Sequence, residues 1–383
     1  MKLRHLSIFL LLGCLGSCDY YFYPEGLDKD SKLYVQCIAG NSDTTFINIQ
    51  KAMGINSVGD IMPDVESVSL RINGKESPIE KYVPTPPEDI PFGTKDTPPE
   101  PFYPEEYVSY YTLRLYNLWC TDAPVREGDQ ISLEVKAKGM QEVSATSVVP
   151  DKVVIKEINV APRCTTVTSF DNTYTEDYVS LDISLENASA DDYYGITIEQ
   201  EQETVLSYDD GRSESYTSKG YGRVIDWNAD QGDVMSEIQG NGETWTEAYY
   251  NGWFIDSYGR GLMKLFPGSL IKDGHLKIDC SILLSEELES SYSEFDQQTG
   301  TWIPGGKMTS RRTGKFRLLF YKVSPEFYRF NRAQYLLENN ALAELGLSPS
   351  TFSYTNVRGG FGVLAALTCN TTQWYPAPYA PER

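Results

Sequence analysis

Apolar and polar residues alternate along much of the first 150 residues of this chain, in short runs bounded by turn residues. The run at 67–72 alternates with period two and ends at Asn73-Gly74, a dipeptide typical of a tight hairpin turn. Further runs of the same kind lie at 111–115, 131–135 and 143–145. Because such alternation gives a strand one buried face, the pattern predicts an immunoglobulin-like or transthyretin-like β-sandwich over residues 31–150.

A proline-rich segment interrupts this predicted sandwich. Eight of the 21 prolines lie between Pro84 and Pro104, and proline cannot donate a backbone hydrogen bond inside a sheet. The segment 84–104 is therefore expected to be a long extended insertion. A solvated loop is the favoured interpretation, and a segment that binds a partner is the alternative.

The alternation resumes after residue 150, where it predicts a second and larger β-rich domain over residues 151–383. The clearest runs of this part lie at 179–185, 276–282 and 316–320. Their spacing and their apolar faces again indicate strands with one side in a core. The chain as a whole is therefore expected to be mainly β.

One helix is predicted near the C-terminus, over residues 325–345. Ser324 is a favourable N-cap, Pro325 suits the first helical position, and Gly346 lies just past the end. The apolar side chains at near-helical spacing are Phe327, Phe330, Leu337, Ala341 and Leu345. They predict a buried stripe by which the helix packs on the rest of the domain.

The first 17 residues have the pattern of an export signal. Lys2 and Arg4 precede an apolar run at 6–12, which is too short to span a bilayer. No later segment is apolar and long enough to be a membrane-spanning helix. Residues 1–17 are therefore expected to be removed on export.

A lipid anchor is predicted at Cys18. Leucine, two small residues and cysteine at 15–18 match a bacterial lipobox, in which the cysteine is acylated and becomes the first residue. The same pattern ending at Cys14 fits less well, and a plain secretory signal is the other alternative. Residues 18–30 would then form a tether between the membrane and the sandwich, because two acyl chains give stable attachment.

Charge argues against nucleic acid as a partner. The chain has 33 basic and 54 acidic residues, and loss of Lys2 and Arg4 with the signal leaves a net charge of −23. A field of that sign repels phosphate backbones. Solubility at a cell surface is the simplest interpretation of this acidity.

Five cysteines remain after lipidation and removal of the signal. They are Cys37, Cys120, Cys164, Cys280 and Cys369. Their wide spacing matches no zinc site, and it indicates small buried apolar residues with at most one disulfide, whose pairing the sequence does not assign.

Histidine usage disfavours an enzyme. Only His5 and His275 occur, and His5 leaves with the signal. His275 follows Asp273-Gly274, which predicts a turn, and no Gly-x-Ser-x-Gly motif accompanies it. With 54 acidic residues no carboxylate pair stands out, so we expect a protein without enzymatic activity.

A calcium loop is one candidate binding site. Asp226, Asn228 and Asp230 occupy positions 1, 3 and 5 of such a loop, and Glu237 occupies position 12. Gly232 falls one position late and no helix pair flanks the loop. Chance occurrence in an acidic chain is therefore the favoured interpretation, calcium is the alternative, and no other cofactor is expected.

An aromatic cluster is the second candidate. Trp245, Tyr249, Tyr250 and Trp253 lie within ten residues of one another. Rings of this density could stack on a ligand or on a partner protein. Packing in the second core is the alternative, and it is slightly favoured.

Several features together resemble one known family. Asn356, Gly359, Gly360 and Gly362 form the pattern Asn-x-x-Gly-Gly-x-Gly before a final apolar run, and Asp-Tyr-Tyr at 192–194 follows a polar turn. With the lipobox, the early sandwich and the late helix, these resemble the Bacteroidota surface lipoproteins of domain of unknown function 4249. Read from the residues alone, the glycines indicate a tight bend or a close backbone approach.

The resemblance implies a role at the cell surface. Members of that family are typically encoded beside TonB-dependent transporters, which implies an outer-membrane lipoprotein, lipid-anchored and facing the cell exterior. The expected function is that of a non-catalytic accessory or substrate-binding partner of such a transporter in nutrient uptake. A structural or adhesive envelope lipoprotein that contacts other surface proteins is the alternative.

Overall fold

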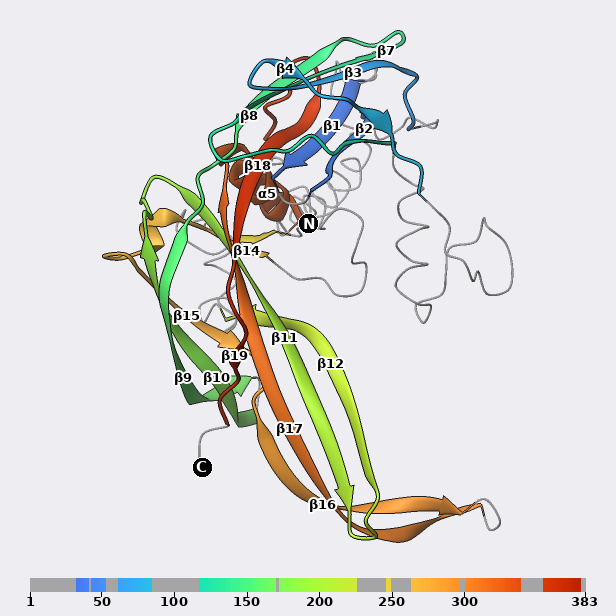
Figure 1. The fold of residues 1–383 in the computed structure, drawn as a ribbon, viewed down its shortest axis with the longest axis vertical. Coiled ribbons are helices and arrows are strands. Elements are labelled where there is room, and N and C mark those ends of the chain that lie inside the picture. The colour runs from blue at the N-terminus through green and yellow to red at the C-terminus, as the bar shows by residue number, and fades with distance from the viewer. Residues whose placement is uncertain are drawn as a thin grey trace, which may run out of the picture.

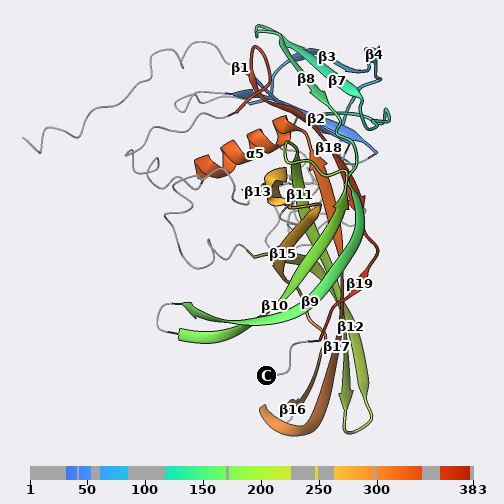
Figure 2. The same cartoon turned by 90° about the vertical axis from the view of Figure 1, so that its left-hand side faces the viewer.

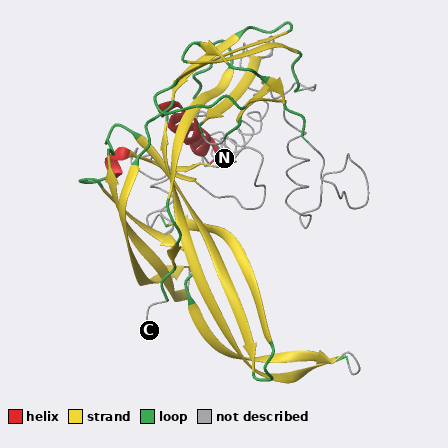
Figure 3. Ribbon diagram, in the orientation of Figure 1, coloured by secondary structure: helices red, strands yellow, loops and turns green. Residues whose placement is uncertain are grey.

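The computed structural model describes residues 32–40, 43–52, 61–84, 117–169, 172–225, 246–248, 263–296, 300–338 and 354–379. Strands dominate these ranges, in which fifteen strands join into one strongly bent sheet and four form a second sheet (Figure 3). One α-helix is present among the described residues. The predicted mainly β fold, with a sandwich first and a helix near the C-terminus, is confirmed.

The N-terminal sandwich lies at one end of the longest axis of the molecule (Figure 1). One of its sheets contains β1 (Lys32–Ala39), β2 (Thr45–Ala52), β5 (Glu80–Lys81) and β6 (Leu118–Thr121), and the facing sheet contains β3 (Val65–Ile72), β4 (Lys75–Glu76), β7 (Gln130–Ala137) and β8 (Val143–Val148).

The alternation read from the sequence explains how the two sheets meet. Alternate residues of β1 and β7 are buried, and Val35 and Leu133 are among the side chains that fill the space between the sheets. The predicted turn at Asn73-Gly74 joins β3 to β4, and both residues have the positive φ angles that this turn requires. Residues 111–115, where another strand is predicted, lie outside the described residues.

The remaining elements build a second β region below the sandwich. They are β9 (Val154–Ser169), β10 (Asn172–Glu186), β11 (Tyr193–Tyr208), β12 (Ser213–Val224), β13 (Thr246–Ala248), β14 (Met263–Pro267), the 3₁₀ turn η1 (Gly268–Leu270), β15 (His275–Ser281), β16 (Glu286–Asp296), β17 (Thr301–Val323), α5 (Pro325–Glu338), β18 (Phe361–Thr371) and β19 (Tyr375–Pro376).

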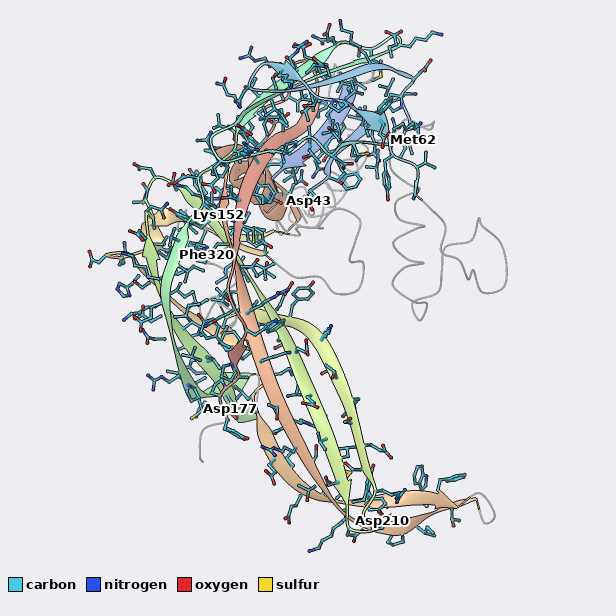
Figure 4. The ribbon with its side chains drawn as sticks, viewed as in Figure 1. Asp43, Met62, Lys152, Asp177, Asp210 and Phe320 are labelled. Atoms are coloured by element: carbon cyan, nitrogen blue, oxygen red, sulfur yellow. The ribbon has the colours of Figure 1, made fainter. Side chains whose placement is uncertain are left out.

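A second core forms where the bent sheet folds over itself. Side chains of β10 and β15, such as Leu181 and Ile278, pack against those of β11 and β17, such as Ile196 and Phe320. Figure 2 shows the β9–β10 hairpin curving away from the long strands β12 and β17. Figure 4 places Phe320 near the middle of the molecule, where these layers come together.

Strand β18 connects the two β regions. It pairs in parallel with β1 and antiparallel with β17, and residues 363–367 are completely buried. Leu364 and Ala366 face the sandwich core, whereas Val363, Ala365 and Leu367 face helix α5 and β14. A strand covered on both faces needs a continuous apolar run rather than an alternating one, which is what 363–367 provide.

Helix α5 covers the second face of β18. Its predicted N-cap is confirmed, because the Ser324 hydroxyl accepts the backbone N–H of Phe327 at 3.4 Å. The same hydroxyl accepts the backbone N–H of Ala366, and the backbone N–H of Ser324 donates to the carbonyl of Ala366 at 2.8 Å. Phe327 and Phe330 are buried as predicted. The rest of the expected stripe belongs to residues whose side chains lie outside the described part of the chain.

The Asn-x-x-Gly-Gly-x-Gly pattern builds the entry to β18. The Asn356 side chain accepts the backbone N–H of Leu364 at 3.0 Å and donates to its carbonyl at 2.8 Å. Gly360 and Gly362 lie so close to β1 that a Cβ atom on either would fall within 2.4 Å of a backbone oxygen. The predicted close backbone approach is therefore confirmed, and at Gly362 a φ of +107° adds to it.

A buried lysine fixes the junction between the two β regions. The Lys322 ammonium donates to Asp151 at 2.6 Å and lies 2.7 Å from Asp192, the first residue of the Asp-Tyr-Tyr motif. The hydroxyl of Thr368 and the amide of Asn370 donate to backbone carbonyls at 151 and 153. Side chains of β17 and β18 thus hold the segment that leaves the sandwich.

The cysteines behave largely as the small buried residues that their spacing suggests. All five that the structure describes are free thiols, and Cys37, Cys120 and Cys280 are buried. Burial raises the pKa of Cys37 and of Cys280 to about 12.

In the described ranges, no helix has the length and apolar character needed to cross a bilayer. The division of the chain into domains at 31–150 and 151–383 stays a prediction.

We expect Gly362→Ala to destabilise the protein strongly. The new Cβ would lie 1.9 Å from the carbonyl oxygen of Val35, so strand β1 must move. The positive φ of this residue adds a conformational cost for alanine. The free energy of unfolding should fall by about 3 kcal/mol or more. Chemical denaturation measures this change.

Gly74→Ala is the matched control for that substitution. Gly74 has a φ of +78° but nothing within 4 Å of its Cβ position, so only the conformational cost of about 1 kcal/mol remains. Equal losses in the two variants would contradict the close approach of β18 to β1.

We expect Lys322→Met to lower stability by about 1–2 kcal/mol near pH 7, since it leaves two carboxylates without their cation. The side chain of Lys322 is 7% exposed, whereas those of Asp151 and Asp192 are 59% and 34% exposed. Solvent therefore screens part of the effect. Lys156→Met, which removes an exposed 3.7 Å pair with Glu186, should change stability far less.

The difference between wild type and Lys322→Met should depend on pH. The hydrogen bond from Lys322 holds the pKa of Asp151 below its usual value. A lowered carboxyl pKa stabilises the fold above the unfolded value of about 3.9, and this stabilisation is lost as pH falls through the folded pKa. Denaturation midpoints measured from pH 7 to pH 2 should therefore converge below about pH 4. A constant difference would contradict the assignment.

Candidate functional site: a projecting β-arm with an apolar tip

The most prominent surface feature is a four-stranded projection that extends away from the second core. Strands β12, β11, β17 and β16 lie side by side in this order, and Figure 1 shows them reaching the end of the molecule opposite the sandwich. We call residues 199–221, 286–296 and 300–317 the arm. Because β17 is 23 residues long, it runs without interruption from the arm to the junction with β18.

One face of the arm is charged. Glu199 pairs with Arg317 at 2.5 Å, and Glu201 pairs with Lys315 at 3.0 Å, directly across β11 and β17. The Trp374 ring covers both cations, at 4.8 and 5.1 Å from the ring centre. Exposed pairs of this kind contribute little to stability, so this face is a solvated surface that keeps the two strands in register.

The opposite face becomes partly apolar away from the core. Gln202 and Thr204 are buried near its base. Farther out, Leu206 is half-buried, and Tyr216 and Leu288 are exposed. The arm is therefore not a simple continuation of the core, because large side chains reach solvent along it.

The arm turns sharply near its end. The register between β16 and β17 shifts at Tyr292 and Ser293, and Gly305 provides space for the Tyr292 ring, which a Cβ would contact at 2.3 Å. Gly306 has a φ of +134° and packs against Asp209, whose carboxylate accepts the backbone N–H of Lys307 at 3.0 Å. A bulge of this kind bends and twists a strand pair.

Arg212 braces this corner. Its guanidinium lies 4.9 Å from the centre of the Tyr208 ring and donates to the Tyr292 hydroxyl at 3.1 Å. It also bonds to Asp210 at 2.6 Å, which Figure 4 places at the bend. The backbone N–H and the guanidinium of Arg212 lower the pKa of Asp210. Side chains from β16 and from the β11–β12 turn therefore fix the corner together.

An apolar cluster lies beyond the corner. Phe295 and Trp302 oppose each other across the β16–β17 hairpin, with ring centres 5.4 Å apart in an edge-to-face arrangement. Trp302 is 70% exposed, Phe295 is 51% exposed and Ile303 is 45% exposed. We call Phe295 and Trp302 the tip, because Ile303 follows Trp302 directly on β17 and its side chain therefore points to the other face of the hairpin. Large apolar side chains gathered in this way on a projection are a surface that a partner can cover.

The sequence-predicted site residues lie outside the described residues. They are the lipidated Cys18, the calcium candidates Asp226, Asn228, Asp230 and Glu237, and the aromatic candidates Trp245, Tyr249, Tyr250 and Trp253. All of these assignments stay predictions. In the part of the chain that the structure does describe, no three His, Cys, Asp or Glu side chains are grouped to hold a metal ion.

His275 lies where the turn signal places it. Asp273 and Gly274 have positive φ angles, and the His275 imidazole Nδ1 lies 2.8 Å from a carboxylate oxygen of Asp182. Ser184 is directly opposite on β10, but among the described contacts no hydrogen bond joins this hydroxyl to the imidazole. Asp182, but not His275, also lines a groove of about 400 Å³ between residues of β9, β10 and β15.

The tip was not anticipated from the sequence. Phe295 and Trp302 flank a short polar segment that contains Gly300, which is the pattern of large apolar residues on both sides of a hairpin turn. This pattern predicts a hairpin but does not distinguish rings that pack in a core from rings that face solvent. Only the solvent exposure of the aromatic side chains separates a core role from a surface role, and a strand pattern alone does not predict that exposure.

We expect Arg212→Gln to loosen the corner without changing global stability. The variant loses the contacts with both tyrosine rings, so the backbone N–H groups of Asp209 and Gly211 should exchange with solvent about fivefold faster. Hydrogen exchange with mass spectrometry checks this. Arg71→Gln, which breaks ion pairs in the sandwich instead, should leave the arm unchanged. Equal protection of the corner in wild type and Arg212→Gln would contradict the bracing role.

Comparison with known proteins identifies a family and nothing finer. A family model described as a domain of unknown function (DUF4249) matches residues 20–373. No curated protein and no solved structure matches the chain. The matched range contains the sandwich, the arm and β18, so the family model spans both β regions.

Proposed function

The chain belongs to the family of the domain of unknown function DUF4249, and on that premise we propose that it is a non-catalytic cell-surface lipoprotein. In this role it serves as an accessory or substrate-binding partner of a TonB-dependent outer-membrane transporter. Cys18 carries the lipid, residues 1–17 are removed on export, and the folded part faces the cell exterior.

The observation that carries the proposal is the projecting arm with its apolar tip. A protein that works by contact needs a surface that reaches beyond its own core and offers large side chains to a partner. The arm has this form, since continuous pairing of β11 with β17 joins it to the second core and its end presents two aromatic rings. Its length suits contact with another protein.

The anchor and the charge support the same role. The residues between Cys18 and Lys32 span at most about 50 Å when fully extended, which keeps the sandwich near the membrane and leaves it free to reorient. A net charge of −23 after processing disfavours nucleic acid. It also keeps the protein soluble at a crowded surface.

Co-purification tests the proposal directly. A tagged copy is extracted from the native outer membrane with mild detergent, and the proteins recovered with it are quantified by mass spectrometry. We expect one TonB-dependent transporter in near-equal amount, and a tagged lipoprotein of another family serves as the control. Recovery of none, or of other envelope proteins alone, would contradict the transporter role and favour the structural or adhesive alternative.

A further inference from the structure

We infer that the groove of about 400 Å³ on β9, β10 and β15 binds a neutral carbohydrate of two or three linked sugar rings. These strands pair side by side, and Figure 2 shows them apart from the end of the arm. The volume is typical of a site for a small molecule. The inference goes beyond the proposed function, because binding of a sugar by the isolated protein does not depend on a transporter.

The shape of the groove follows from the strand register. Ala161 faces Ser180 across β9 and β10, and these two small side chains form the floor. Longer side chains lie at the two ends, Asn159 and Asp182 at one and Arg163 at the other. Asn159 and Arg163 are on the same face of β9, about 13 Å apart at 3.3 Å per residue. That length suits two or three sugar rings better than one.

The side chains that face the groove are almost all polar. Val160, Leu181 and Ile278 belong to the lining, but their side chains pack in or against the second core. Hydrogen-bonding side chains make up most of the rest of the β9, β10 and β15 lining, and they are Asn159, Arg163, Ser180, Asp182, Lys277 and Asp279. Donors and acceptors thus alternate around the groove. A ligand rich in hydroxyl groups satisfies both kinds, because each hydroxyl donates and accepts.

The charges of the lining cancel, which favours a neutral ligand. Asp182 and Asp279 are balanced by Arg163 and Lys277, although the protein as a whole is strongly acidic. A cationic ligand would meet two like charges in the groove, and so would an anionic one. A neutral ligand meets no such repulsion, and charged side chains hold its hydroxyl groups more strongly than neutral side chains would.

The acidic side chains of the groove are held in place before a ligand binds. The Ser180 hydroxyl donates to the Asp279 carboxylate. The Asp182 carboxylate lies 2.8 Å from the imidazole Nδ1 of His275 and 3.8 Å from the Lys277 ammonium. Asp182 is 33% exposed, and a carboxylate can accept about four hydrogen bonds, so room remains for a sugar hydroxyl. Side chains fixed in this way lower the ordering cost of binding.

Titration of the purified full-length lipoprotein with neutral trisaccharides tests the inference. The probes are maltotriose, cellotriose, xylotriose and mannotriose, and the charged comparators are trigalacturonate and the glucosamine trimer. Saturation-transfer NMR, in a detergent without a sugar headgroup, measures binding. We expect at least one neutral probe to bind with a Kd of about 1 mM or lower. Binding of no neutral probe, or tighter binding of a charged comparator, would overturn the inference.

Ala161→Phe tests whether the groove is the site. The new ring would occupy the floor, and phenylalanine suits a strand, so the affinity for the probe should fall at least tenfold. Thr165→Phe, on the same face of β9 but outside the groove, is the matched control and should keep the affinity of wild type. Equal affinity in wild type and Ala161→Phe would mean that the sugar binds elsewhere, and would overturn the inference.

Arg163→Met keeps the test valid if Ala161→Phe does not fold. The Arg163 side chain is exposed, so its loss should leave thermal unfolding unchanged, whereas the loss of a charged donor should weaken binding about tenfold. Unchanged affinity in this variant would contradict the assignment. None of these measurements needs a transporter. Failure to co-purify one would therefore end the proposed partnership and leave sugar binding standing, and failure to bind sugar would leave the partnership standing.

Discussion

The structure depends on one constraint, which is that β18 must be apolar on both of its faces. A strand with a single buried face can alternate, but residues 363–367 lie between the sandwich core and helix α5 and are completely buried. The small side chains of Ala365 and Ala366 let both layers approach. The glycines at the start of the strand let β1 approach from the side, where any Cβ at Gly362 would overlap a carbonyl oxygen.

This constraint links the sandwich to the arm. β18 pairs with β1 on one edge and with the end of β17 on the other, and β17 continues from that junction to the tip. Lys322, close to the end of β17, adds an ion pair to the segment that leaves the sandwich. The direction of the arm is thus set by contacts in the most buried part of the molecule, whereas its outer half depends on the pairing of β16 with β17 and on the corner. We therefore expect local stability to decrease from the core towards the tip.

Local sequence patterns predicted individual strands, a turn and an N-cap. They did not predict which strands pair with one another. The alternation at 67–72 and 179–185, the turn at Asn73-Gly74 and the N-cap at Ser324 each depend on neighbouring residues, and each is confirmed. The parallel pairing of β1 with β18 joins segments more than 300 residues apart, and nothing in either run names the other. The exposure of the tip could not be predicted for a related reason, because it depends on which other residues the fold places nearby. The Asn356 motif marked a close approach without saying which strand was approached.

Native-state hydrogen exchange of the amides in β1, in β18 and in the last five residues of β17 tests the central claim most directly. If β18 joins the sandwich to the second β region, amides of β1, of β18 and of residues 319–323 should exchange through one opening, with the same free energy and the same denaturant dependence. A sandwich that opens at a much lower free energy than β17 and β18 would contradict this account. It would mean that the two β regions fold as separate units that merely touch at β18.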